Sequence, residues 1–238
     1  MEKRGIGHIE IILSFVIFIV AVGFGLYFFN TGDSDRLVDT TLAYAFKEIE
    51  ENTSIIIEVY SVDLNETNIG VNTIIALNFS GVDGESRVVN YDGDNLSSSR
   101  GGMDDELVFV YSDDWSSEEF IFVMFGEEFD AGSVLPFEHN ETFYRIGSSE
   151  IKELISERKF IELNSSYYED YGGLKSQENF NIPGRADFGF SLVFDDGDVI
   201  AAEKGIPDNF EVFSERKRVE VLRVSNDVVF ADLIVKVW

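Results

Sequence analysis

The segment from Ile11 to Phe29, IILSFVIFIVAVGFGLYFF, constrains this chain more than any other feature. It has nineteen residues, no charged side chain and one clearly polar residue, Ser14. As an α-helix it is about 28 Å long, close to the thickness of the hydrocarbon core of a bilayer. A helix also satisfies its own backbone hydrogen bonds in lipid. A buried core helix is the alternative, but a continuous run that is apolar on every face favours a transmembrane helix.

The charges on either side of this segment predict its orientation. Lys3 and Arg4 precede it, which favours a cytoplasmic N-terminus and places the rest of the chain outside the cell. The chain has 45 acidic and 18 basic residues, of which only Glu2, Glu10, Lys3 and Arg4 lie before residue 31. The remaining excess of acid opposes binding to nucleic acid or to an anionic membrane surface. A soluble, self-repelling surface is the simplest interpretation, and adaptation to high salt is an alternative.

Two further features agree with an external location. There is no cysteine, so the external part must hold together without disulfides. Asn-x-Ser/Thr motifs predict N-glycosylation of an exposed surface, although polar loops rich in Asn and Ser would produce some of them. The motifs lie at Asn52, Asn65, Asn78, Asn95, Asn140 and Asn164.

The apolar helix is expected to stay with the mature protein. A secretory signal peptide needs small residues in an A-x-A-like pattern after its apolar stretch. The sequence GLYFFNTGDS has the bulky Phe28 and Phe29 at that place. Cleavage on the external side is therefore not expected.

The first thirty residues resemble the start of a type IV prepilin, in particular the archaeal class III signal peptides. The resemblance lies in the basic leader MEKRG with its final glycine, the glutamate five positions later and the apolar helix that follows. It implies that a prepilin peptidase, a membrane aspartyl peptidase, recognises Lys3 and Arg4. That enzyme would cleave between Gly5 and Ile6 on the cytoplasmic side, so that Glu10 becomes the fifth residue of the mature chain.

Glu10 has a physical role in this interpretation. A carboxylate is costly inside a membrane and less so near the interface. Cleavage would free a positive α-amine at Ile6, and opposite charges attract strongly where the dielectric constant is low. Pairing with the amine of a neighbouring chain would fix the axial register of packed helices, as pairing within one chain would not. The alternative is that Glu10 only marks the interfacial end of an ordinary anchor.

The rest of the chain predicts an α+β, mainly β fold, with an antiparallel β-sandwich or sheet head carried by helices, as in pilins. Apolar residues of 35–51 follow the helical period, and we expect this stripe to pack on the head. Gly32 and its polar neighbours predict a break or kink before that helix. The predicted parts are a basic leader (1–5), a transmembrane or assembly helix (6–30), an amphipathic helix (31–52) and an extracellular β-rich head (53–238).

Within the head, β-branched and aromatic runs separated by turn residues predict strands at 53–62, 72–82, 86–91, 106–112 and 118–126. Ser148 or Ser149 is expected to cap a helix over 148–159, and 167–185 is expected to be a loop. Two hairpins are predicted, 186–204 across Asp195–Asp198 and 216–238 across Asn226–Asp227. In the last strand, alternate residues share one face: Ala231, Leu233, Val235 and Val237.

The sequence offers little for catalysis or metal binding. Walker, Rossmann and HExxH patterns are absent, and His139 is the only histidine after the apolar segment. Paired carboxylates could serve a glycosidase, but they lie between strands, where Asp is an ordinary turn former. We therefore predict no enzyme activity, no cofactor and no metal site. Asp92 and Asp94 in DGDNLSS are weak calcium candidates without the EF-hand spacing.

Three hypotheses follow. The first is a minor pilin or pseudopilin, with the prepilin peptidase, other pilin-like subunits and the membrane (residues 11–29) as partners. The second is an uncut, single-pass anchor that carries an extracellular β-domain for adhesion or ligand binding. The third, an anchored hydrolase, has the least support. The N-terminal residue of the mature protein distinguishes the first two.

Overall fold

The computed structural model describes residues 6–65, 69, 73–102, 105–133, 144–176, 178–206 and 210–238. In the first helix, the described side chains are those of residues 12–25 and of residues from 39 onward. The fold is α+β and mainly β, as predicted. Its elements in chain order are α1 (Ile6–Thr53), β1 (Ser54–Leu64), β2 (Thr73–Asn78), β3 (Glu85–Asn90), β4 (Asn95–Gly101), β5 (Leu107–Ser112), the 3₁₀ turn η3 (Trp115–Ser117), β6 (Phe120–Gly126), β7 (Tyr144–Ser156), α2 (Glu157–Glu169), α3 (Tyr171–Leu174), β8 (Phe188–Phe194), β9 (Val199–Ala202), β10 (Phe213–Leu222) and β11 (Val228–Val237).

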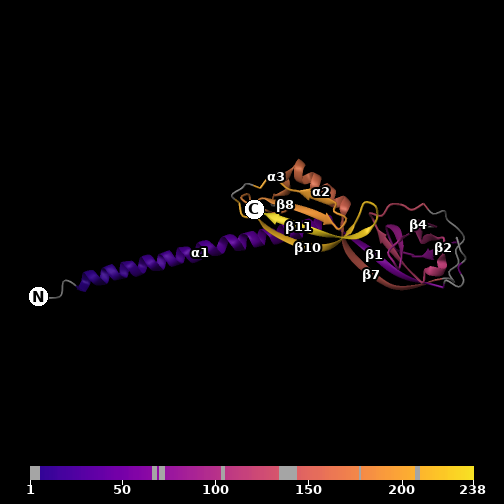
Figure 1. The fold of residues 1–238 in the computed structure, drawn as a ribbon, viewed down its shortest axis with the longest axis horizontal. Helices are drawn as coiled ribbons and strands as arrows, with labels where there is room; N and C mark the ends of the chain where they lie inside the picture. The colour runs from indigo at the N-terminus through magenta and orange to yellow at the C-terminus, as the bar shows by residue number, and fades with distance from the viewer. Residues whose placement is uncertain are drawn as a thin grey trace.

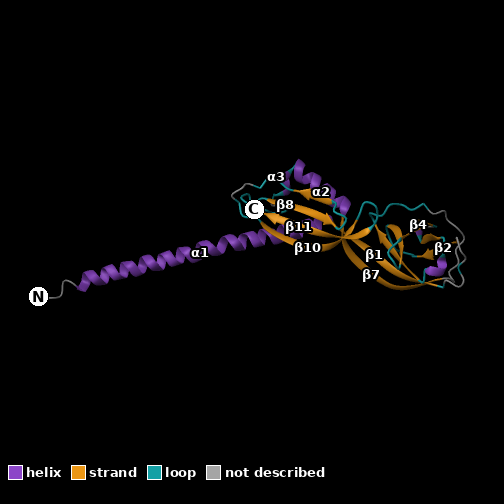
Figure 2. Cartoon of the chain, viewed as in Figure 1, coloured by secondary structure: helices purple, strands orange, loops and turns teal. Residues whose placement is uncertain are grey.

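The strands form one sheet in the order β2-β5-β4-β3-β6-β1-β7-β10-β11-β8-β9. Neighbours are antiparallel except β7 and β10, which pair in parallel only through Val221↔Ile155 and Leu222↔Ser156. This short pairing lies where the molecule narrows between two lobes (Figures 1 and 2). The described strands are therefore divided into two groups, which are joined by this short pairing and by contacts of the β10–β11 turn, among them the ion pair between Arg87 and Asp227 at 2.8 Å.

The two lobes are not consecutive in the sequence. The helix-bearing lobe contains the C-terminal part of α1 together with α2, α3 and β8–β11. The inserted lobe contains β1–β7, residues 54–156. Because β1 follows α1 directly and α2 follows β7 directly, this second lobe is inserted between two helices of the first. It lies at the end of the molecule far from the N-terminus (Figure 1).

In the helix-bearing lobe, α1 and α2 cover the same face of the sheet. The alternate residues predicted for the last strand are all buried, and they share their face with the aromatic side chains of β8. Phe160 of α2 packs edge-on against Phe190 of β8, with ring centroids 5.3 Å apart. The contribution of α1 is the predicted apolar stripe, with Leu42, Ala45, Phe46 and Ile49 buried in the same core.

The inserted lobe has its own hydrophobic core, formed by the inward-facing residues of β1–β6. Trp115 is 1 % exposed and donates its indole N–H to the carbonyl of Thr73 at 2.8 Å. At Gly84 (φ +86°) a side chain would lie 2.8 Å from the backbone of Gly126, so this approach of two strands requires glycine. The runs 106–112 and 118–126, apolar on both faces, form the interior strands β5 and β6, as their pattern indicates.

The predicted break at Gly32 is wrong, because α1 is one helix of 48 residues. Glycine costs a helix only about 1 kcal/mol relative to alanine, and the segment contains no proline. Helix formation is cooperative, so a single glycine between two strong segments does not end it.

The helix predicted over 148–159 is also wrong. Residues 144–156 form β7, which pairs with β1 from Leu64↔Tyr144 to Ser54↔Ile155. Ser148 and Ser149 therefore cap nothing; the backbone N–H of Ser148 instead bonds to Ser61 Oγ at 2.9 Å. Long-range pairing overrides the local helical pattern here, and α2 begins only after Ser156, whose Oγ accepts from Lys159 N at 3.1 Å.

Two other segments differ from prediction. The expected loop over 167–185 is helical at its start, since α2 extends to Glu169 and α3 covers Tyr171–Leu174. Strand β4 was not predicted, because its sequence NLSSSRG carries few apolar residues. The two C-terminal hairpins are confirmed as β8–β9 and β10–β11, and Asn226 in the second turn has a positive φ of 67°.

Candidate functional site

The first candidate site is the N-terminal part of α1. In Figure 1 this helix projects from the helix-bearing lobe as a single rod. Between residues 12 and 24, ten large apolar side chains are 41–64 % exposed: Ile12, Leu13, Phe15, Val16, Ile17, Phe18, Ile19, Val20, Val22 and Phe24. Six of them are consecutive, so they cover every side of the helix. Full burial of one such side chain stabilises by about 1.5–3 kcal/mol. The segment is therefore suited to apolar surroundings.

The predicted processing residues can be placed only in part. Lys3, Arg4 and Gly5 lie outside the described residues. Ile6 and Glu10 belong to the backbone of α1, but their side chains lie outside the described part. Across the part of the chain whose side chains are described, no helix has a stretch long and apolar enough to span a membrane.

The other end of α1 is held firmly against the head. Ile49 is fully buried, and Thr53 Oγ1 donates to the Ile49 carbonyl at 2.6 Å in the last turn. Lys217 of β10 reaches back to Glu50 at 2.6 Å and lies 5.9 Å from the ring centre of Phe46. Because β1 starts at the next residue, no loop separates the helix from the sheet.

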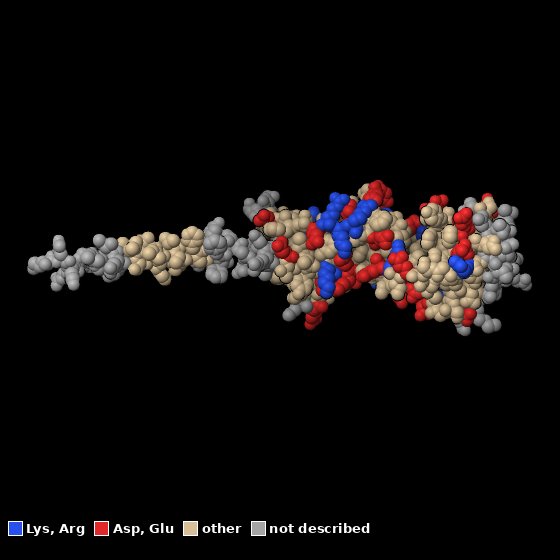
Figure 3. Space-filling model, turned by 90° about the horizontal axis from the view of Figure 1, so that it is seen from below, with Lys and Arg blue, Asp and Glu red and all other residues tan. Residues whose placement is uncertain are grey.

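The head surface is mostly acidic, with one basic region. In the view of Figure 3, most Lys and Arg side chains gather on the lobe from which α1 projects, among Asp and Glu. Arg216 and Arg218 of β10 both pair with Asp232, and Arg218 also pairs with Asp195. Their ion pairs leave little net positive charge for an anionic partner.

The predicted glycosylation sites differ in their surroundings. Asn65 is exposed just after β1, and Asn52 is exposed with its Nδ2 bonded to the Glu48 carbonyl at 2.7 Å. Asn78 is half-buried at the end of β2, and Asn140 lies outside the described residues. The amides of the remaining two connect separate elements: Asn95 Nδ2 donates to Asp227 at 3.0 Å and Asn164 Nδ2 donates to the Ala201 carbonyl at 2.8 Å. An asparagine Nδ2 carries two hydrogens, so a glycan at either position would have to replace the one that is not donated in this bond.

The carboxylate clusters have structural roles. Asp92 and Asp94 lie in the β3–β4 turn, where Asn90 Oδ1 accepts from the Asp94 N–H at 2.8 Å. Asp196 and Asp198 both pair with Arg223, at 3.2 and 3.0 Å. In the described ranges, no group of three or more His, Asp or Glu residues could hold a metal ion. His139 lies outside those ranges.

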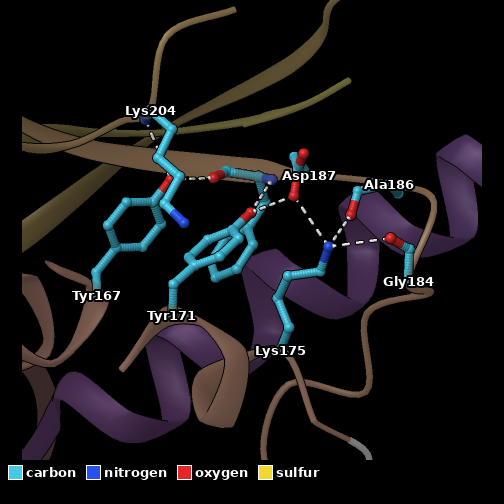
Figure 4. Close-up of polar contacts among 8 residues, drawn as sticks. Tyr167, Tyr171, Lys175, Gly184, Ala186, Asp187 and Lys204 are labelled. Atoms are coloured by element: carbon cyan, nitrogen blue, oxygen red, sulfur yellow. Dashed lines mark hydrogen bonds and ion pairs between the residues drawn. The ribbon is translucent and has the colours of Figure 1, made fainter. Parts of the chain in front are cut away.

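A tyrosine cluster, formed by Tyr167, Tyr171 and the residues around them, was not predicted (Figure 4). Tyr167 donates to the carbonyl of Phe188 at 2.6 Å. Tyr171 donates to Asp187 at 2.8 Å, and Lys175 donates to the same oxygen at 2.9 Å. These contacts join α2 and α3 to the start of β8.

The protonation states in this cluster argue against acid–base catalysis. Burial raises the pKa of Tyr167 to about 12 and raises the pKa of Tyr171 further. Burial would also raise the pKa of Asp187, but hydrogen bonds from Lys175 and Tyr171 outweigh it and lower that pKa. Both phenols are thus neutral and Asp187 is charged near neutral pH, which suits a structural network. The helical spacing of Phe160, Leu163 and Tyr167 is the sequence signal that could have predicted α2, the helix that positions the tyrosine cluster.

Comparison with protein-family models, with curated proteins and with solved structures finds no match to this chain.

Proposed function

We propose that this chain is a pilin-like subunit of a cell-surface filament, in the manner of a minor pilin or pseudopilin. A prepilin peptidase removes residues 1–5 by cleaving between Gly5 and Ile6. The helix then holds the protein in the membrane through residues 11–29, with the head outside. During assembly it leaves the lipid and packs against the helices of other pilin-like subunits.

The observation that carries the proposal is the contrast between the two ends of α1. Its C-terminal end contributes Leu42, Ala45, Phe46 and Ile49 to the head core. Its N-terminal part carries a continuous apolar surface, and the large apolar side chains from Ile12 to Val20 are each more than half exposed. A rod with this surface is stable only when something apolar surrounds it, and lipid and neighbouring copies of the same helix both meet that need.

The leader supplies the step that distinguishes an anchor from a filament subunit. Cleavage after Gly5 exposes the amine of Ile6 four residues before Glu10. In a packed bundle, the amine of one subunit neutralises Glu10 of its neighbour, so each helix has a defined axial position. The pair contributes register, while the apolar side chains contribute adhesion.

Replacing Glu10 with Gln tests this role. We expect Glu10→Gln to remain in the membrane fraction but to reduce the amount of sedimentable filament by at least about tenfold, equivalent to 1.4 kcal/mol. The matched control is Glu2→Gln, a change of the same chemistry inside the leader, which should assemble normally. Filaments of Glu10→Gln formed at the wild-type level would contradict the proposal.

The second candidate function is an uncut anchor with an adhesive or ligand-binding head. The observation that favours it is the inserted lobe, which has a core of its own and lies far from α1. Under this alternative, Met1 remains on the mature protein and α1 acts only as a tether.

A further inference from the structure

The free edge of β7 is the feature that points to a partner. One edge of this strand pairs with β1 over nearly its whole length. The other edge meets β10 only at Ile155 and Ser156. Among the described strands, none pairs with this edge from Arg145 to Leu154. Arg145 to Ile151 and Glu153 are exposed, and a β-bulge between Ile146 and Ser149 interrupts the register with β1, so the regular part of this open edge runs from Ser149 to Leu154.

Two exposed isoleucines lie beside this edge. Ile151 of β7 is 72 % exposed and Ile56 of β1 is 68 % exposed. The register pairs Ile56 with Glu153 and Glu58 with Ile151, so both isoleucines project from the same face of the sheet as diagonal neighbours. A partner that extends the sheet at β7 would cover this apolar pair.

The sequence around Ile151 is complementary to itself. In an antiparallel pair of two β7 strands centred on Ile151, each Glu150 lies opposite a Lys152 of the other copy. Two oppositely charged cross-strand pairs then flank a central Ile151–Ile151 contact. Shifting the register so that Lys152 meets Arg145 places like charges together. The net charge of −27 opposes unspecific association of two copies, so a local match of this kind is required.

We propose that a second copy of this chain binds here, through antiparallel pairing of β7 with β7 over Ser149–Glu153. The pair ends before Ile155, where β10 occupies the edge. The contact is isologous, so it closes as a dimer. The strand lies in the lobe opposite the N-terminus and runs roughly along the length of the molecule (Figure 1). The pairing therefore sends the two α1 helices in opposite directions and links heads carried by two different surfaces or filaments. This inference does not depend on cleavage of the leader.

Disulfide crosslinking tests the pairing directly, because the chain has no native cysteine. In the proposed register the two Ile151 Cα atoms are about 4.5–5.5 Å apart, within reach of a disulfide. Full-length Ile151→Cys in detergent should form a disulfide dimer on mild oxidation. The matched control is Ser149→Cys on the same exposed strand, whose Cα lies about 13 Å from its counterpart and should not crosslink.

Exchanging the charges of Glu150 and Lys152 is a second test of the pairing. In the Ile151→Cys background, Glu150→Lys or Lys152→Glu alone places like charges opposite each other and should reduce the dimer yield about tenfold. The double variant Glu150→Lys/Lys152→Glu restores both pairs and should restore the yield. Circular dichroism verifies that each variant is folded.

Two results would overturn the proposal. One is crosslinking of Ile151→Cys that is no stronger than that of Ser149→Cys. The other is a double charge exchange that fails to rescue the single ones, which would assign the edge to some other occupant. Either result would leave the N-terminal residue of the mature chain and the effect of Glu10→Gln unchanged, so the two proposals fail separately.

Discussion

The hydroxyl of Tyr167 joins three parts of the helix-bearing lobe. From α2 it donates to the carbonyl of Phe188 and accepts from the backbone N–H of Lys204 at 3.2 Å, and its side chain is fully buried. Tyr167→Phe leaves both backbone groups without this partner. We expect it to lower the free energy of unfolding by about 1–2 kcal/mol, measured by denaturant titration followed through tryptophan fluorescence. Tyr168→Phe is the control, because that side chain is 59 % exposed and its hydrogen bonds are long, so it should be nearly neutral.

The same residue predicts a response to alkaline pH. The pKa of Tyr167 is about 12 in the folded protein because of burial, whereas an unfolded tyrosine has a pKa of about 10. A raised pKa contributes stability that is present below pH 10 and is lost as the pH rises toward 12. Wild-type stability should fall over that interval, and Tyr167→Phe should fall less steeply. The pKa of Tyr171 is raised in the same direction, so the stability of the Tyr167→Phe variant should still fall somewhat with pH. Equal slopes for the two proteins would contradict this account of the cluster.

At the scale of elements, the packing of α1 on the sheet decides whether head and rod move as one body. Ile49→Ala removes a fully buried side chain from the α1 stripe, and we expect a loss of about 2–5 kcal/mol. Buried Trp238 reports on this lobe in a Trp115→Phe background. Lys47→Ala, which removes an exposed ion pair with Glu51 on the same helix, should leave the free energy of unfolding nearly unchanged. Similar losses for the two variants would show that α1 is not held by this core.

Local patterns predict elements well where burial repeats along the chain. The stripe of α1 and the alternation of β11 both follow one face in contact with one core, and both are confirmed. The segment 148–156 does not have such a repeating pattern of burial, because Leu154 and Ile155 are buried while Ile151 is exposed. Its strand conformation depends on β1, about a hundred residues away in the sequence, and no local period reveals such a partner.

At the scale of the whole molecule, the sequence predicts one head where the structure has two lobes. The insertion of residues 54–156 between α1 and α2 depends on pairing Ser54 with Ile155, a contact between distant positions. No Gly- or Pro-rich linker lies at either boundary, so nothing in the composition marks residues 54–156 as an inserted lobe. The candidate site at the N-terminal part of α1 depends on no such contact between distant positions. The apolar run, its leader and Glu10 are adjacent in the chain, so their arrangement can be predicted from the sequence.

The identity of the N-terminal residue of the mature chain tests the central claim most directly. Intact-mass analysis of the membrane-extracted protein, with N-terminal sequencing, should give a chain that starts at Ile6 and carries a free amine. Gly5→Leu should retain the leader, because a bulky residue replaces glycine at the cleavage site. A functional wild-type protein that still begins at Met1 would contradict the account and leave an anchored ectodomain in its place.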